Sequence, residues 1–482
     1  MNTNTYIGID FGTTNTSVVL IATDEHGRRT RILGEDGKFP FASILAIDDT
    51  FSINFGNQVK LQREFLSDKC KVISSFKSIL GQKKEVNIYG RRFLPKDILT
   101  KYLECLKTYI ISKHNVDIKS AAFSFPVNFS REARADLVEA ARAAGITVTN
   151  LISESTAAYL ATRNETKGLQ RVMVVDWGGG TLDISILEIG GNRVREIAVG
   201  GEQIGGDYID KELAQRIHAK LNLKLENKDE AVAFEEMAPE QKDKLINACE
   251  KAKIQISEDG GNYLLTIRNY GIYGTKTLKI SVEEFEDILK PIIEKYVVGT
   301  IRKVLNRAEL SPGSIDAVVA AGGSSSLRMF GLVLENIFGA EKVIRPRDFQ
   351  FVSAEGAAVT NEIGGEFRLN DDVGILLSDN TVFPILQKEE DGVNSQKQYT
   401  FSLVEDAPDA HFIFTNGNGK NVFDKINVPT KGFLKEHLVV TAQIGFDQIA
   451  KIRIHSDAMP KSYLQKLEIT GLTYYYELAN QQ

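Results

Sequence analysis

The order of apolar and polar residues predicts two similar β-hairpins that lie far apart in the chain. Residues 6–20 (YIGIDFGTTNTSVVL) and residues 173–188 (MVVDWGGGTLDISILE) each hold an apolar run that ends in aspartate, a Gly/Thr turn and a second β-branched run. This pattern is typical of two strands joined by a tight turn, because glycine adopts the backbone angles that such a turn needs. Two copies predict two related lobes, each beginning with this hairpin.

Helical and strand patterns alternate through the rest of the first 360 or so residues. Residues 317–321 (AVVAA) read as a buried strand, and a Gly-Gly pair and three serines follow it. Serine before an apolar-periodic segment predicts a helix N-cap there. Residues 131–144, after Ser130 as cap, and residues 239–256, with proline in the first turn, predict two further helices.

The pattern changes near residue 362, beyond which short alternating segments predict strands. These segments are residues 399–404, 411–415, 438–444, 449–455 and 467–476. Turn residues separate them, so this part reads as an all-β sandwich. We therefore expect an α/β domain over residues 1–365, a linker or first strand over 366–379, and a small β-domain over 380–482.

Composition narrows the possible functions. The chain has 482 residues, of which 43% are hydrophobic, and its formal net charge is −6, which disfavours nucleic acid as a partner. Its three cysteines form no CxxC pair and its six histidines no HExxH motif, which argues against a disulfide framework or a zinc site. No signal-like start and no apolar run of about 18 residues occur, so we expect a cytoplasmic protein that does not enter a membrane.

The two Gly/Thr turns are the candidate site for binding phosphate and Mg²⁺. Backbone N–H groups and threonine hydroxyls in such a turn bind phosphate oxygens, and an aspartate at the strand end can hold Mg²⁺ directly or through water. If the turns face each other, Asp10 and Asp176 would share the metal, and the site would transfer a phosphoryl group to water. No P-loop sequence is present, and a strand rather than a helix follows residues 178–180, which fails the Rossmann pattern.

Five motifs together resemble the 70-kDa heat-shock (DnaK-type) chaperones of the actin and sugar-kinase superfamily. The motifs are residues 7–18 (IGIDFGTTNTSV), 151–161 (LISESTAAYLA), 174–185 (VVDWGGGTLDIS), 248–257 (ACEKAKIQIS) and 318–326 (VVAAGGSSS). The resemblance implies an α/β fold with a duplicated, two-lobed, ribonuclease-H-like ATPase domain, followed by a small all-β sandwich. It also implies that ATP or ADP binds between the lobes.

The resemblance places site residues at the matching positions. The implied phosphate contacts are Gly12, Thr13, Thr14, Asn15, Gly178, Gly179 and Gly180. The implied catalytic residues are Asp10, Lys77, Glu154, Asp176, Thr181 and Asp183. The implied nucleoside contacts are Gly205, Gly206, Glu250, Lys253, Ser257, Gly322, Gly323, Ser324 and Arg328. Mg²⁺ is expected on Asp10 and Asp176 through water, and the family allows K⁺ as a further ion. From the residues alone, Glu250 and Lys253 could instead form a surface pair on one helix.

Several positions depart from the family pattern. Ser326 stands where an arginine would stack on adenine, and Arg328 lies two residues later. Trp177, the single tryptophan, replaces a smaller residue, and we expect it to pack the sheet while lying close to the phosphate site. The C-terminal part resembles the peptide-binding β-domain only in pieces, and no helical lid follows it. A truncated β-domain of this kind is expected to hold peptide weakly.

These features favour an ATP-dependent, chaperone-like ATPase whose β-domain engages an unfolded or specific client polypeptide. The family adds a J-domain co-chaperone and a nucleotide exchange factor as partners, and a role in protein folding and the stress response. An alternative is a nucleotide-gated interaction or scaffold protein with little ATP turnover. A small-molecule kinase of the same superfamily is a third, less favoured reading, because we find no sugar pocket and no matching catalytic aspartate.

Overall fold

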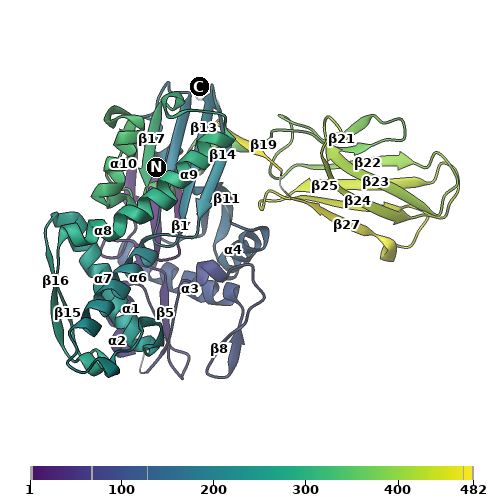
Figure 1. Ribbon diagram of the computed structural model, residues 1–482. Coiled ribbons are helices and arrows are strands. Elements are labelled where there is room, and N and C mark those ends of the chain that lie inside the picture. The colour runs from purple at the N-terminus through teal and green to yellow at the C-terminus, as the bar shows by residue number, and fades with distance from the viewer. Residues whose placement is uncertain (1–3, 26, 67–68, 128, 471, 480–482) are drawn as a thin grey trace. The chain divides into compact units, whose positions relative to one another are not determined.

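The computed structural model describes residues 4–25, 27–66, 69–127, 129–470 and 472–479 (Figure 1). The chain divides into two compact units. Unit 1 comprises Met1–Glu188 and Ile197–Glu362, and unit 2 comprises Ile189–Glu196 and Ile363–Gln482. The chain therefore passes between the units three times. No helix among the described residues is long and apolar enough to cross a membrane.

The first lobe of unit 1 is built on a sheet with the strand order β11-β10-β1-β2-β3, and a short strand β4 also pairs with β2. Its strands are β1 (Asn4–Phe11), β2 (Asn15–Asp24), β3 (Gly27–Ile32), β4 (Phe41–Ala42), β10 (Ser120–Phe125) and β11 (Thr147–Ser153). Strands β1 and β2 form the predicted antiparallel hairpin, and β10 runs parallel to β1.

The second lobe repeats this arrangement with the order β18-β17-β12-β13-β14. Its strands are β12 (Arg171–Trp177), β13 (Leu182–Gly190), β14 (Arg193–Glu202), β17 (Ala317–Ala321) and β18 (Val343–Ile344). Strands β12 and β13 form the second antiparallel hairpin, and β17 runs parallel to β12. The predicted duplication of the α/β fold is confirmed.

Helices and small sheets complete unit 1 (Figure 1). The helices are α1 (Asn57–Leu61), α2 (Arg63–Leu66), α3 (Pro95–His114), α4 (Arg131–Ala143), α5 (Glu154–Ala161), α6 (Gly206–Leu223), α7 (Pro239–Asp259), α8 (Val282–Ile292), α9 (Gly299–Arg307), α10 (Arg328–Phe338) and α11 (Val352–Ile363). The small sheets contain β5 (Ile44–Ile47) with β6 (Ile53–Phe55) and β7 (Lys71–Ser74), β8 (Val86–Ile88) with β9 (Arg91–Phe93), and β15 (Tyr263–Ile267) with β16 (Lys276–Ile280).

The helix ends test the capping predictions. At α4 the Ser130 side chain accepts a hydrogen bond from the Ala133 N–H, as expected of an N-cap. The prediction of a serine cap at α10 is wrong, because Leu327 precedes that helix. The hydroxyls of Ser324 and Ser326 instead donate to the carbonyls of Gly178 and Gly323 within a 3₁₀ turn.

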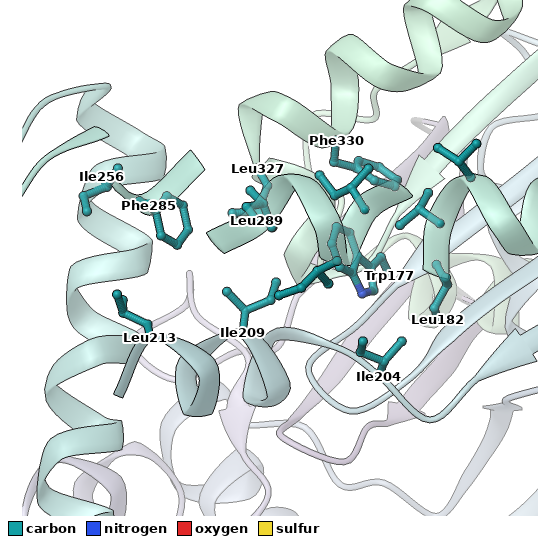
Figure 2. Close-up of a cluster of buried hydrophobic side chains, with 14 of the residues drawn as sticks. Trp177, Leu182, Ile204, Ile209, Leu213, Ile256, Phe285, Leu289, Leu327 and Phe330 are labelled. Atoms are coloured by element: carbon teal, nitrogen blue, oxygen red, sulfur yellow. The ribbon is translucent and has the colours of Figure 1, made fainter. Parts of the chain in front are cut away.

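Trp177 lies in the core of the second lobe (Figure 2). Successive strand side chains point to opposite faces, so Asp176 faces the cleft while the indole of Trp177 faces inward. The ring is fully buried and its centroid lies 5.3 Å from that of Phe330. The expectation that it packs the sheet is confirmed, but the ring does not line the cleft. Within the described part of the chain, the indole N–H has no hydrogen-bond partner.

Unit 2 contains a sandwich of two four-stranded sheets, β21-β20-β23-β24 and β22-β25-β26-β27. Its strands are β20 (Val373–Leu376), β21 (Val382–Leu386), β22 (Gln396–Ser402), β23 (Asp409–Asn416), β24 (Val422–Pro429), β25 (His437–Ile444), β26 (Ala450–Ser456) and β27 (Gln465–Ile469). Apolar side chains from both sheets form one core, which includes Phe414, Val440 and Ile452.

Three further strand segments in unit 2 pair with one another. Strand β28 (Tyr474–Glu477) pairs antiparallel with β19 (Glu366–Leu369) and with Arg193–Arg195 at the start of β14. The predicted strand over residues 467–476 is therefore two strands, β27 and β28, in different sheets. The segment 366–379, expected to be a linker or first strand, holds the two strands β19 and β20.

Candidate functional site

The two Gly/Thr turns lie against each other in unit 1. A Cβ atom added to Gly179 would lie 2.1 Å from the Thr14 hydroxyl oxygen, and one added to Gly180 would lie 2.8 Å from the Thr13 Cβ. Contacts this short leave no room for a side chain at either glycine. Backbone N–H groups and threonine hydroxyls from both lobes are thereby gathered at one place, which is an arrangement suited to phosphate oxygens.

A cavity of about 360 Å³ opens at these turns, and most of the residues expected at the site line it. Those that do are Asp10, Gly12, Thr13, Thr14, Asn15, Lys77, Glu154, Asp176, Gly178, Gly179, Gly180, Thr181, Gly206, Glu250, Lys253, Ser257, Gly322, Gly323 and Ser324. Three others lie elsewhere. Gly205 packs against the backbone of residues 178 and 179, Asp183 lines a neighbouring cavity, and Arg328 lines a small cavity beside α8.

Lys77 is the buried cation of the cleft. A short 3₁₀ helix (Phe76–Ile79) carries it, and the fully packed Phe76 ring holds that helix against α3. Its side chain is 7% exposed, and its Nζ lies 3.1 Å from a carboxylate oxygen of Glu154, the first residue of α5. Burial disfavours the charged amine, but the carboxylates of Glu154, Asp10 and Asp183 outweigh this and raise the Lys77 pKa. The lysine therefore stays charged at neutral pH.

Four acidic side chains surround this one lysine. Burial, together with the nearby Asp10 and Asp183, raises the pKa of Asp176 to about 7, and burial raises the pKa values of Asp10 and Glu154. The Ser124 hydroxyl donates to Asp10 at 2.9 Å, and the Ser353 hydroxyl donates to Asp176 at 3.2 Å. The cleft thus holds more carboxyl groups than one lysine can pair with, and a bound cation would stabilise their charged forms.

Asp10 and Asp176 fit Mg²⁺ held mainly by water and phosphate oxygens. Among the residues that the structure describes, no three His, Cys, Asp or Glu side chains form a metal-binding group. Mg²⁺ commonly binds through one or two carboxylates and keeps several waters, so a two-aspartate site is sufficient. The raised pKa values of both carboxyls agree with a site whose charge balance a cation would complete.

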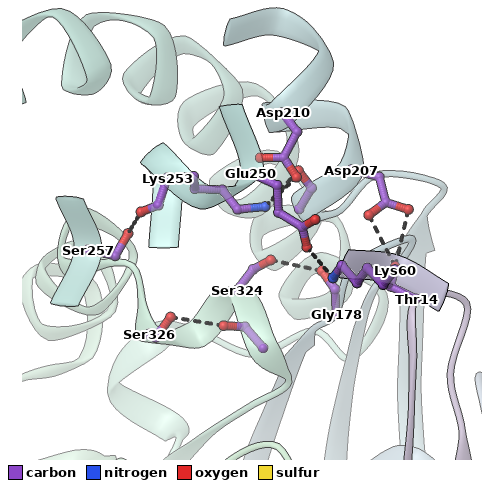
Figure 3. A network of polar contacts seen from close by, with 12 residues as sticks. Thr14, Lys60, Gly178, Asp207, Asp210, Glu250, Lys253, Ser257, Ser324 and Ser326 are labelled. Atoms are coloured by element: carbon purple, nitrogen blue, oxygen red, sulfur yellow. Dashed lines mark hydrogen bonds and ion pairs between the residues drawn. The ribbon is translucent and has the colours of Figure 1, made fainter. Parts of the chain in front are cut away.

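Helix α7, part of which Figure 3 shows, lines the end of the cavity where the nucleoside contacts were expected. Lys253 donates to an Asp210 carboxylate oxygen at 2.7 Å and to the Gly206 carbonyl at 3.0 Å. Glu250 does not pair with Lys253 but accepts from the Lys60 amine at 2.6 Å. Burial raises the pKa of Asp210 to about 7. The two residues on α7 therefore connect to different elements, rather than forming a surface pair with each other.

Two ion pairs join the first lobe to α7. They are Lys60–Glu250 and Arg63–Asp243, with N–O distances of 2.6 and 2.8 Å. A further contact, from the Thr14 hydroxyl to Asp207 at 3.1 Å, joins the first Gly/Thr turn to the start of helix α6. Sequence analysis named Glu250 but missed Lys60, Arg63 and Asp243, because the partners in each pair are 180 or more residues apart.

The part of the cavity wall where adenine was expected carries no arginine among its described residues, unlike the family pattern. Ser326, Leu327 and the 45%-exposed Ile254 line the cavity there, while the exposed Arg328 side chain lies outside it. Glu258 also lines this end and was not predicted. An aliphatic and polar wall can pack against a base but supplies no guanidinium to stack on it.

Comparison with known proteins agrees with this geometry. The family model described as Hsp70 protein matches residues 81–407. The proteins named Chaperone protein DnaK from Thermotoga neapolitana, Thermotoga petrophila and Thermotoga maritima are each 30% identical over 365 residues. These alignments cover 73% of this chain and 58% of each relative. The chain belongs to the Hsp70 family, a family of ATP-binding chaperones with an actin-like, two-lobed ATPase domain, and it spans less than two thirds of these relatives.

Proposed function

We propose that this Hsp70-family protein binds Mg-ATP in the cleft of unit 1 and hydrolyses it to ADP and orthophosphate. One observation carries the proposal: two Gly/Thr turns from opposite lobes meet beside a buried lysine and four acidic side chains. Phosphoryl transfer needs this combination of phosphate donors, a cation and positioned oxygen groups. We also propose a cytoplasmic location, which the likeness to the family supports and the geometry does not address.

The residues of the cleft have different roles in the proposed hydrolysis. The two turns hold the β- and γ-phosphates, and Lys77 neutralises charge that develops on the γ-phosphoryl oxygens. Water forms a bond to the γ-phosphorus as the bond from phosphorus to the β–γ bridging oxygen breaks, which leaves ADP. Glu154, whose pKa is raised by burial, can accept the proton that the water loses. Mg²⁺, when bound through Asp10 and Asp176, neutralises phosphate charge.

Unit 2 is proposed to engage polypeptide at one end of its sandwich. Val404, Phe433 and Leu434 are 74, 51 and 55% exposed on two loops of that end. Backbone hydrogen bonds fasten the loops together, from the Thr430 N–H to the Pro408 carbonyl and from the Lys435 N–H to the Leu403 carbonyl. Ordered, exposed apolar side chains suit an extended apolar segment. A J-domain co-chaperone and a nucleotide exchange factor are further proposed partners.

Single-turnover hydrolysis with and without excess unfolded polypeptide tests this function. Acceleration by the polypeptide is the expected result, and replacing Phe433 with serine should reduce the acceleration while leaving the basal rate intact. The exposed Tyr463 supplies the matched control, because the same change there removes an aromatic ring from another surface loop. A hydrolysis rate that is the same with and without the polypeptide would contradict the proposal that unit 2 engages a client.

A nucleotide-gated binding module with little turnover remains the second candidate. The observation that favours it is the base-side wall, where Ser326 and Ile254 line the cavity and Arg328 does not. ATP that binds and persists uncleaved in the same experiment would select this alternative.

A further inference from the structure

A second cavity, of about 280 Å³, adjoins the nucleotide cleft. Thr13, Lys77 and Thr181 line both cavities. The two spaces therefore meet at the tips of the Gly/Thr turns and at the buried lysine. In the function proposed above, this junction is where the γ-phosphoryl group is cleaved.

Both lobes contribute walls to this second cavity. The first lobe supplies residues 78 and 80–82 and the start of α4, and the second lobe supplies Asp183, Glu202 and Gln203. Gln82 and Gln203 are exposed to solvent, one from each lobe. The cavity thus leads from the cleavage point to a solvent-accessible rim on a side away from helix α7, none of whose residues lines it.

We propose that this second cavity is the exit chamber for the orthophosphate product. The inference rests on the proposed hydrolysis. A volume of about 280 Å³ is many times the ~30 Å³ that one water occupies, so the chamber can hold phosphate and several waters. While ADP fills the first cavity, its phosphates and nucleoside lie between the cleavage point and the end of the cavity that α7 lines. The second cavity offers a route that does not require ADP to leave.

The charged residues along the chamber favour the passage of orthophosphate over its retention. Lys77, at the junction, attracts the anionic product. Asp183, which lies near Lys77, and Glu202 also line the chamber, and Glu202 is itself paired with Lys303 at 2.8 Å. Carboxylates oppose the binding of an anion, so phosphate gains no strong site after leaving the lysine.

Substitutions that place bulky side chains at the rim of the chamber test the proposed exit route of orthophosphate. Gln82→Trp and Gln203→Trp narrow it from either lobe, and Lys83→Trp is the matched control, because Lys83 is exposed and adjacent but does not line the chamber. A quenched single turnover measures cleavage, a fluorescent phosphate sensor measures orthophosphate release, and a fluorescent ADP analogue measures ADP release. Both rim variants should slow phosphate release at least tenfold, with cleavage within twofold of wild type. Release at the wild-type rate in both variants would overturn the proposal.

A test without turnover separates this proposal from the hydrolysis on which it rests. Orthovanadate, an analogue of phosphate, is added to the ADP-bound protein, and its capture is followed as a slowing of ADP-analogue release. The rim variants should capture vanadate at least tenfold more slowly than wild type and Lys83→Trp. Equal capture rates, or no capture by wild type, would overturn the exit route. Capture by a wild type that leaves ATP uncleaved would contradict the hydrolysis and support the route.

Discussion

The buried carboxylate of Glu436 holds the loop that presents Phe433 and Leu434, and its replacement gives a sharp prediction. The side chain is 1% exposed and lies at the start of β25. Its oxygens accept hydrogen bonds from the Lys431 N–H at 2.9 Å, from the Gly432 N–H at 3.0 Å and from the Ser456 hydroxyl. The change Glu436→Gln keeps the size but turns one acceptor into a donor that faces these groups.

The expected cost follows from the bonds that are lost. Hydrogen bonds to charged groups contribute about 1.5–3 kcal/mol each, and the amide keeps one acceptor oxygen, so the loop should lose about 2–4 kcal/mol. That loss corresponds to roughly 30- to 700-fold faster opening of the loop. The matched control is Glu405→Gln, an identical change at an exposed position of the adjoining loop, which should change stability by no more than about 0.5 kcal/mol.

Hydrogen exchange at the Lys431 and Gly432 amides is the direct assay, because both N–H groups donate to this carboxylate. Burial alone would raise the Glu436 pKa, but the Ser456 hydroxyl and the N–H groups of residues 431–433 outweigh it and lower the pKa. A lowered pKa means that the stabilisation is complete above the ordinary carboxyl range and is lost as pH falls through the lowered value. Unchanged exchange at both amides in Glu436→Gln would refute the reasoning.

Two further predictions concern unit 1. Trp177→Ala should lower the free energy of unfolding by about 3–5 kcal/mol, because it empties a fully buried site. Trp177→Phe should lower it much less, since the indole N–H has no partner among the described residues. Chemical denaturation of both variants measures the two losses, and equal losses would contradict the packing account. Lys60→Ala and Arg63→Ala each remove one ion pair between the first lobe and α7. Each change should speed release of a fluorescent ADP analogue by about 1.4- to 5-fold, because partly exposed pairs contribute about 0.2–1 kcal/mol. Stopped-flow release that matches the exposed-pair control Arg92→Ala would show that the two pairs do not restrain release.

The sequence predicted those features that depend on neighbouring residues. The hairpins at Asp10 and Asp176, the cap at Ser130 and the alternating strands of unit 2 are all local patterns, and the structure contains them. The placement of Lys77 and Glu154 in one site came only from the family resemblance, and their ion pair was not predicted, because no local pattern links residues 77 positions apart.

Features that depend on distant contacts could not be predicted. The serines before α10 looked like a helix cap, but the carbonyl of Gly178, from the other end of the domain, engages Ser324 instead. The ion pair between Lys60 and Glu250 and the pairing of β28 with β14 join segments far apart in the chain. Tertiary contacts of this kind override local propensity.

The measurement that tests the central claim most directly is single-turnover ATP hydrolysis by wild type and Lys77→Ala, with ATP binding followed in parallel by calorimetry. The account predicts that wild type cleaves bound ATP, and that the variant still binds ATP but cleaves it at least a hundredfold more slowly, because the cation beside the γ-phosphate is gone. Wild-type cleavage rates in Lys77→Ala would contradict the assignment of this lysine, and bound ATP that wild type leaves intact would contradict the proposed ATPase.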